Sequence, residues 1–182
     1  MKELSLHILD IFYNSLSAGA DTIKIGLDTD TVKDTLTITI EDNGKGMSET
    51  FLNNVLNPFT TTRTTRKVGL GLPLFSEAAK ACNGSFDIVS QLGKGTTVTA
   101  VFQNSHIDRA PLGDMAETVA SMVLSLGHTR LIYTQSFNGE SFTLDTREVQ
   151  DILGEEVSIQ SLEVISWIKE YVQSGIESIM EV

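Results

Sequence analysis

The side chains that could carry chemistry lie in three short stretches of the first hundred residues. Asp10 and Asn14 stand four positions apart in an apolar segment, a spacing that places both on one face of a helix. Residues 42–46 put an aspartate before two glycines, and residues 59–72 mix threonines, cations and glycines. A carboxylate can accept a proton or a hydrogen bond, an asparagine oxygen can bind a hard cation, and hydroxyls with cations suit an anion. The elements around these stretches must bring them together.

The central stretch places Asp42 directly after a predicted strand. Residues 35–41 alternate strictly between apolar and polar side chains, which predicts a half-buried strand. Gly44 and Gly46 tolerate positive φ and let a ligand approach the backbone without a Cβ in the way. On its own, this pattern is more often an ordinary exposed turn, so its meaning depends on the other stretches.

The first predicted helix, residues 2–18, is largely buried because apolar residues cover most of its circumference. A narrow polar stripe runs along it, and such a stripe must find partners or line a wet pocket. The simpler alternative is a solvated face, and we expect His7 to be a satisfied helix residue rather than a ligand. The stripe consists of Glu3, His7, Asp10, Asn14 and Ser17.

Residues 59–72 contain five threonines, three cations and two glycines without an amphipathic pattern, which predicts a loop. Its hydroxyls and cations suit an anion, and the glycines open a helix whose free N–H groups can cap a phosphate. A plain surface loop is the alternative. Because the stretch leads into a strongly patterned helix at 71–82, phosphate contact is favoured.

The order of the predicted elements up to residue 104 is α-β-β-α-loop-α-β-β. This order predicts an α+β fold: a two-layer α/β sandwich in which helices cover one face of a mixed sheet. The predicted helices are residues 2–18, 48–56 and 71–82, and the predicted strands are residues 22–28, 35–42, 85–91 and 96–103.

Composition excludes several classes of protein. The formal charge of −11 argues against nucleic acid as a general partner, since phosphate backbones attract Lys and Arg. No stretch approaches eighteen apolar residues, so we expect no membrane span. The single cysteine, Cys82, excludes an internal disulfide, and the start of the chain lacks the features of a secretory signal. A cytoplasmic location is therefore expected.

A shift in charge near residue 105 predicts two parts, residues 1–104 and residues 105–182. The first part carries 9 basic and 11 acidic side chains, a net of −2, and the second carries 4 basic and 13 acidic, a net of −9. The second part is predicted to be a small α+β subdomain. Its acidic surface could dock a protein partner or mediate a homodimer, and the sequence does not separate these alternatives. Its predicted elements are helices at 110–126, 146–153 and from 161 onward, and a hairpin of strands at 130–137 and 140–146.

Four segments in the first part together resemble the GHKL superfamily of ATP-binding domains, which includes gyrase, heat-shock chaperones, histidine kinases and mismatch-repair ATPases. Residues 10–20 resemble the N box of the family, and residues 42–47 resemble its first glycine box. Residues 58–63 with 69–72 resemble the lid and second glycine box of histidine kinases, and residues 93–96 resemble the final box. The resemblance covers residues 3–103.

The resemblance implies an ATP and Mg²⁺ site and assigns the roles within it. Asn14 would coordinate Mg²⁺, Asp42 would accept a hydrogen bond from the adenine amino group, and Thr96 would support the adenine end. Arg63, with Arg66 or Lys67, would lie near the terminal phosphates. The implied ATP-binding residues are Asn14, Asp42, Gly44, Gly46, Met47, Thr60, Thr61, Thr62, Arg63, Gly69, Leu70, Gly71, Leu72 and Thr96.

Two positions depart from the family's pattern. Hydrolytic members usually carry Glu four residues before the Mg²⁺ asparagine, and many histidine kinases carry Asn there; this chain has Asp10. A carboxylate keeps general-base catalysis available, with a reach one methylene shorter. Ser17 stands where mismatch-repair relatives carry an acidic residue. Asp10 is therefore the candidate general base.

Because the N box begins almost at residue 1, we expect a stand-alone ATP-binding domain without a phosphoacceptor module. The main expectation is an ATPase or an ATP-dependent regulatory switch that captures ATP under a Thr/Arg-rich lid. One alternative is a stand-alone serine kinase resembling anti-sigma-factor kinases. The other is an ATP-gated partner-binding module that does not hydrolyse ATP.

Overall fold

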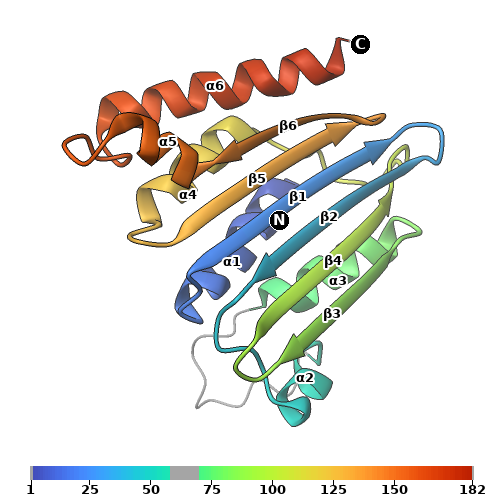
Figure 1. Cartoon of the computed structure of the whole chain (residues 1–182). Helices are drawn as coiled ribbons and strands as arrows, with labels where there is room; N and C mark the ends of the chain where they lie inside the picture. Colours follow the sequence, from blue (N-terminus) through green and yellow to red (C-terminus); the bar gives the residue numbers. More distant parts are fainter. Residues whose placement is uncertain (1, 58–69, 182) are drawn as a thin grey trace.

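A computed structural model describes residues 2–57 and 70–181 of the chain, which form one six-stranded sheet with helices packed against it (Figure 1). The strand order across the sheet is β3-β4-β2-β1-β5-β6. In chain order the elements are α1 (Leu4–Ser17), β1 (Thr22–Asp30), β2 (Thr35–Asp42), α2 (Glu49–Asn54), α3 (Gly71–Ala81), β3 (Ser85–Gln91), β4 (Gly95–Gln103), α4 (Met115–Ser125), β5 (Arg130–Phe137), β6 (Glu140–Asp145), α5 (Thr146–Leu153) and α6 (Leu162–Met180).

The sheet is mixed because one of its five strand pairs is parallel. β1 pairs antiparallel with β2, β2 with β4, β3 with β4, and β5 with β6, whereas β1 and β5 run parallel. The predicted α+β fold with a mixed sheet is therefore confirmed.

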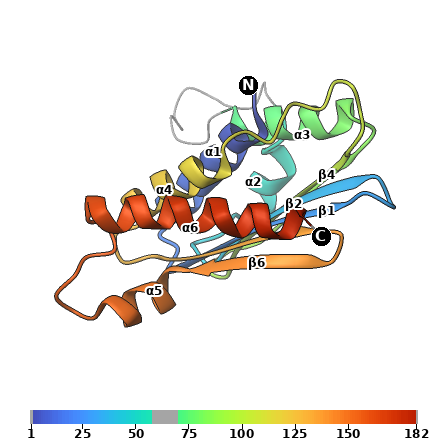
Figure 2. The same cartoon turned by 90° about the horizontal axis from the view of Figure 1, so that it is seen from above.

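Four of the helices, α1, α3, α4 and α6, lie on one face of this sheet, and α5 follows directly on the end of β6 (Figure 2). Seen from above, α1, α3, α4 and α6 form a layer over the strands (Figure 2). Alternation along each strand sends one set of side chains under this layer, as Ile23, Ile25 and Leu27 of β1 illustrate with exposures of 2% or less. The opposite face of the sheet carries polar side chains such as Lys24 and Glu41, which form a surface ion pair.

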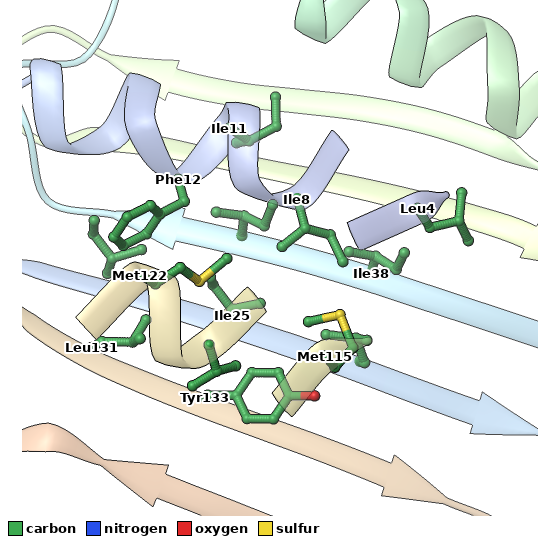
Figure 3. Packing of buried hydrophobic residues seen from close by; sticks show 14 of the residues in the cluster. Leu4, Ile8, Ile11, Phe12, Ile25, Ile38, Met115, Met122, Leu131 and Tyr133 are labelled. Atoms are coloured by element: carbon green, nitrogen blue, oxygen red, sulfur yellow. The ribbon is translucent and has the colours of Figure 1, made fainter. Parts of the chain in front are cut away.

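The core fills the space between the sheet, α1 and α4 (Figure 3). Ile8 and Phe12 of α1 meet Met122 of α4 over the strands, where Ile25 of β1 and Tyr133 of β5 point up toward them. Side chains from both predicted parts of the chain belong to this one cluster.

The second part of the chain continues the sheet of the first. The β5–β6 hairpin turns at Asn138 (φ 49°) and Gly139 (φ 91°), as the Asn-Gly pair predicts. Its first strand lies along β1, with Thr22 opposite Arg130, and α6 covers the hairpin and α4. The boundary between residues 104 and 105 stays a prediction, and both the sheet and the core run across it.

The helix predicted at 110–126 begins later, at Met115. Gly113 has a φ of +87°, which is outside helical backbone, and Asp114 caps the helix by accepting a hydrogen bond from the Glu117 N–H at 2.8 Å. The segment before it has another role, because α1 has no side-chain cap of its own. The N–H groups of Leu4 and Ser5 instead donate to carbonyl oxygens of the 111–112 segment at 3.0 and 2.9 Å.

Candidate functional site

Asp42 is held at the end of β2 by two hydrogen bonds. The Ser15 hydroxyl of α1 donates to its Oδ2 at 2.6 Å, and the Gly44 N–H donates to its Oδ1 at 2.9 Å. Ser15 is buried, whereas Asp42 is partly exposed. The carboxylate is therefore fixed in direction while each oxygen keeps a lone pair for a further donor.

The glycines around Asp42 are required by close backbone contacts. A Cβ on Gly44 would lie 2.8 Å from the Ala18 Cβ, and a Cβ on Gly46 would lie 2.0 Å from the Gln91 carbonyl oxygen. Gly46 also has a φ of +66°, which disfavours other residues. These glycines let the loop after β2 pack against α1 and against the β3–β4 turn.

Thr96 reaches the same loop through a residue that the sequence did not single out. Its hydroxyl bonds the Ser90 hydroxyl at 2.8 Å, and Ser90 accepts a hydrogen bond from the Met47 N–H at 2.8 Å. Ser90 also donates to the Gly95 carbonyl at 3.0 Å. The final predicted box therefore supports the first glycine box through Ser90.

Asp10 meets the start of α3. A Cβ on Gly71 would lie 3.3 Å from the Asp10 Cβ and 3.4 Å from its Oδ2, so the carboxylate lies beside the Gly71 Cα. Asn14 lies one helical turn further along α1, next to Ser15, and is partly exposed. The α1 face thus runs from the Gly71 end of the site to the Asp42 end.

The helix α3 begins without a side-chain cap. Leu70 is its N-cap and is exposed, while Gly71 and Leu72 are buried in the first turn. Helix N–H groups in a first turn lack partners within the helix and attract anions. This position fits the predicted contact of residues 70–72 with phosphate, which stays a prediction.

His7 differs from its expected role as a satisfied residue. Its side chain is 3% exposed and stacks on Phe75 with 5.1 Å between ring centroids, yet its Nδ1 has no hydrogen-bond partner in the described part of the chain. Burial lowers the pKa of His7 from 6.5 to about 4. His7 is therefore a neutral, buried imidazole between α1 and α3.

Several predicted ligands lie outside the described residues. They are Thr60, Thr61, Thr62, Arg63 and Gly69, together with Arg66 and Lys67. The described residues also hold no group of three or more His, Cys, Asp or Glu side chains that could bind a metal by themselves. A cation at Asn14 would therefore need further ligands, such as phosphate oxygens.

The sequence model of the family described as histidine kinase-, DNA gyrase B- and HSP90-like ATPase matches residues 2–106. The chain belongs to this ATPase family. The matched residues include the Asp42 loop, Asp10, Asn14 and the start of α3, so the described parts of the candidate site all fall within the ATPase-family domain.

Curated relatives of this domain are longer proteins. Over 64 residues the chain is 39% identical to the C4-dicarboxylate transport sensor protein DctB of Pseudomonas aeruginosa, covering 35% of this chain and 10% of that protein. Over 92 residues it is 29% identical to sporulation kinase D of Bacillus subtilis, covering 50% of this chain and 18% of the kinase. The chain thus spans less than a fifth of the length of these relatives.

A solved structure shows that the fold is shared more widely. The N-terminal domain of a DNA repair protein matches with a TM-score of 0.56 at 14% identity, covering 80% of this chain and 53% of that one. At this identity the similarity concerns the fold alone. Because 80% of the chain exceeds residues 2–106, the similarity includes part of the segment after the family domain.

Two residues of the site escaped the sequence analysis, Ser15 and Ser90. Ser15 lies on the buried side of α1. A buried hydroxyl requires a hydrogen-bond partner, so a serine among the apolar positions of this helix could have indicated a polar contact. Ser90 lies in a strand of alternating exposure and showed no such signal. Its importance depends on the neighbouring strand, which places Ser90 opposite Thr96.

Proposed function

We propose that the chain binds Mg²⁺-ATP between α1, the loop after β2 and the start of α3, and acts as an ATPase or an ATP-dependent regulatory switch. The observation that carries this proposal is the fixed carboxylate of Asp42, oriented by Ser15 and the Gly44 N–H. Family membership supports ATP as the ligand. A preorganised acceptor at this place suits the exocyclic amino group of adenine.

The described residues fit both the nucleotide and the cation. Gly44 and Gly46 leave no room for a Cβ beside Ala18 and Gln91, so close packing fixes the loop that follows Asp42. Asn14 supplies an amide oxygen, a ligand type that Mg²⁺ accepts beside phosphate oxygens. Bound Mg²⁺ would neutralise part of the phosphate charge, and the predicted lid residues 60–63 would supply further neutralisation.

The position of Asp10 supports a catalytic role for the proposed ATP site. Its carboxylate lies beside Gly71, where the first N–H groups of α3 would meet the phosphates, and it is exposed. A carboxylate there can orient a water or a partner hydroxyl and take its proton. Transfer of phosphate to a protein serine, and binding without turnover, are the alternatives to hydrolysis.

Calorimetry on Asp42→Asn tests nucleotide binding. The change keeps the shape of the side chain and removes its charge, so we expect ATP affinity to fall about 10- to 100-fold, the range for a hydrogen bond to a charged group. Asp28→Asn is the matched control, because Asp28 is exposed on β1 and stays clear of the site. Equal affinity in Asp42→Asn and the control, with both variants folded by circular dichroism, would refute the assignment.

A single-turnover assay with γ-labelled ATP then decides what happens to the phosphate. Release of inorganic phosphate that is abolished by Asp10→Asn identifies an ATPase. Label on an added partner protein identifies a kinase, and ATP recovered intact after hours identifies a non-hydrolysing switch. Asp21→Asn is a suitable control, since this exposed aspartate lies beyond the end of α1.

We further propose that residues 105–182 mediate contact with a protein partner or with a second copy of the chain. Their net charge of −9, from 4 basic and 13 acidic side chains, suits a basic surface. In residues 2–57 and 70–181 no helix is both long and apolar enough to cross a membrane. The cytoplasmic location and the absence of a nucleic-acid partner stay predictions.

A further inference from the structure

A pocket of about 440 Å³ lies at the end of the sheet opposite Asp42. The register of β1 and β2 shows that the two places are far apart. Asp42 pairs with Ile23 at one end of these strands, and Leu36 pairs with Thr29 near the other end. Its lining comes from the sheet, where Thr29 and Leu36 lie, from α4 and α6, and from the 104–114 segment. Its volume is in the range of sites for small organic molecules.

Apolar and polar side chains both line this pocket. Leu36 and Met115 are each 3% exposed, and Phe137 and Ile176 are partly buried beside them. Met180 lies at the rim and is 55% exposed. The apolar part of this wall suits an apolar body on the ligand.

Gln135 contributes a side-chain amide to the lining of the pocket. The residue is 7% exposed and lines the pocket, and its Oε1 accepts a hydrogen bond from the Tyr133 hydroxyl. No described residue accepts a hydrogen bond from its Nε2. A ligand oxygen in the pocket would satisfy it.

Arg109 contributes a fixed positive charge at the same pocket. Its Nε donates to the Asn104 carbonyl at 2.6 Å and its Nη1 to the Ala110 carbonyl at 3.1 Å. Within the described parts of the chain, no carboxylate lies close enough to form an ion pair with it. Two carboxylates lie near the pocket: Asp114 caps α4, and Glu3, beside Gly113, accepts a hydrogen bond from the Ser5 hydroxyl. The guanidinium is thus held by hydrogen bonds to neutral carbonyls, and the Asp34 carboxylate interacts with it at a distance too long for an ion pair.

We propose that this pocket is a second ligand site, which binds a small organic acid with an apolar body. The carboxylate of the ligand would pair with Arg109 and accept a hydrogen bond from Gln135, and its apolar body would lie against Leu36, Met115 and Phe137. Charge-assisted hydrogen bonds to a carboxylate are the strong ones, and arginine suits this geometry. The site uses none of the proposed nucleotide ligands, so it can be tested without ATP.

The methionines of the chain allow a direct test by NMR with ¹³C-methyl labelling. Met115 and Met180 line the pocket, whereas Met47 lies at the opposite end of the sheet, where its N–H bonds Ser90. Titration with octanoate is expected to shift the Met115 and Met180 signals in a saturable way and to leave Met47 unchanged. Octanol and octylamine test the requirement for a carboxylate, and both are expected to bind at least about tenfold more weakly than octanoate.

Two variants and one control complete the test. Arg109→Gln is expected to weaken octanoate binding about tenfold or more, the effect of losing a charged hydrogen-bond partner. Gln173→Trp places a large ring at the pocket from an exposed position on α6, and it is expected to abolish the shifts without disturbing the core. Arg147→Gln removes an exposed arginine on α5 and is expected to bind octanoate as the unmodified chain does.

The opposite results would overturn the proposal. Octanoate that shifts Met47 as much as Met115, or that binds Gln173→Trp unchanged, would place binding elsewhere. Octanol that binds as tightly as octanoate would refute the acid specificity. If Arg109→Gln loses its fold, Gln173→Trp still decides whether the pocket is the site.

Discussion

The buried imidazole of His7 makes a quantitative prediction about stability and pH. Burial lowers its pKa from 6.5 to about 4, so the folded chain keeps the imidazole neutral over a range in which the unfolded chain protonates it. Unfolding therefore takes up a proton between these two values. Stability is expected to fall as the pH falls below about 6.5, and this loss is complete below about pH 4.

The size of the effect follows from the two pKa values. The pKa of His7 is 6.5 in the unfolded chain and about 4 in the folded chain. This difference predicts that the free energy of unfolding falls by about 2 kcal/mol between pH 7 and pH 5. His7 is 3% exposed, so solvent does little to screen this difference. A loss of this size is a substantial fraction of the 5–15 kcal/mol that holds typical domains together.

The assay is urea unfolding at pH 7 and pH 5 in the unmodified chain and in His7→Phe. Phenylalanine keeps a ring against Phe75 but cannot be protonated, so the variant is expected to lose about 2 kcal/mol less between the two pH values. His128→Gln is the control, because His128 is exposed, and it should behave as the unmodified chain does. Equal losses in His7→Phe and the unmodified chain would refute the reasoning, as would an NMR titration that places the pKa of His7 near 6.5.

Three further substitutions test other contacts. Asn14→Ala is expected to remove most of the dependence of ATP binding on Mg²⁺; calorimetry with and without the cation checks this, and an unchanged dependence would place the metal elsewhere. Gly46→Ala must displace the Gln91 carbonyl, 2.0 Å from the new Cβ, and should lower ATP affinity at least about tenfold, whereas an unchanged affinity would contradict the close approach. Gly175→Ala would place a Cβ 2.2 Å from the ring of Phe142, and urea unfolding should show a loss of about 1–3 kcal/mol in stability; unchanged stability would mean that the Phe142 ring can move aside without cost.

Local patterns predicted most of the secondary structure because each pattern reflects one buried face. The alternation at residues 35–42 corresponds to β2, and the Asn-Gly pair at 138–139 turns the last hairpin. The parallel pairing of β5 with β1 could not be predicted from the sequence. Alternation shows that a strand has a buried face, but it does not show which strand lies beside it. For the same reason the sequence did not show that the β5–β6 hairpin extends the sheet of residues 1–104.

The candidate site was predictable where the residues themselves carry the signal. Asp42 and the two glycines after it stood out because their types and spacing are informative, and the structure surrounds them with close contacts. Ser15 and Ser90 did not stand out, because a serine acquires its role from the acceptor that folding brings to it. The unsatisfied Nδ1 of His7 likewise depends on the packing of α3 against α1.

The parallel pairing of β1 with β5 has a consequence for how the chain is made. β1 is complete once residue 30 has been synthesised, yet one of its edges is covered only by β5, which starts at residue 130 (blue and orange in Figure 1). At the usual rates of synthesis, the ribosome needs roughly 5 to 20 s to make the residues between them. During this interval the edge of β1 can pair with the strand of another nascent chain. The charged side chains of Lys24 and Asp28 on β1 are a natural protection against such pairing, so their replacement by apolar residues should lower the yield of folded protein more than its final stability.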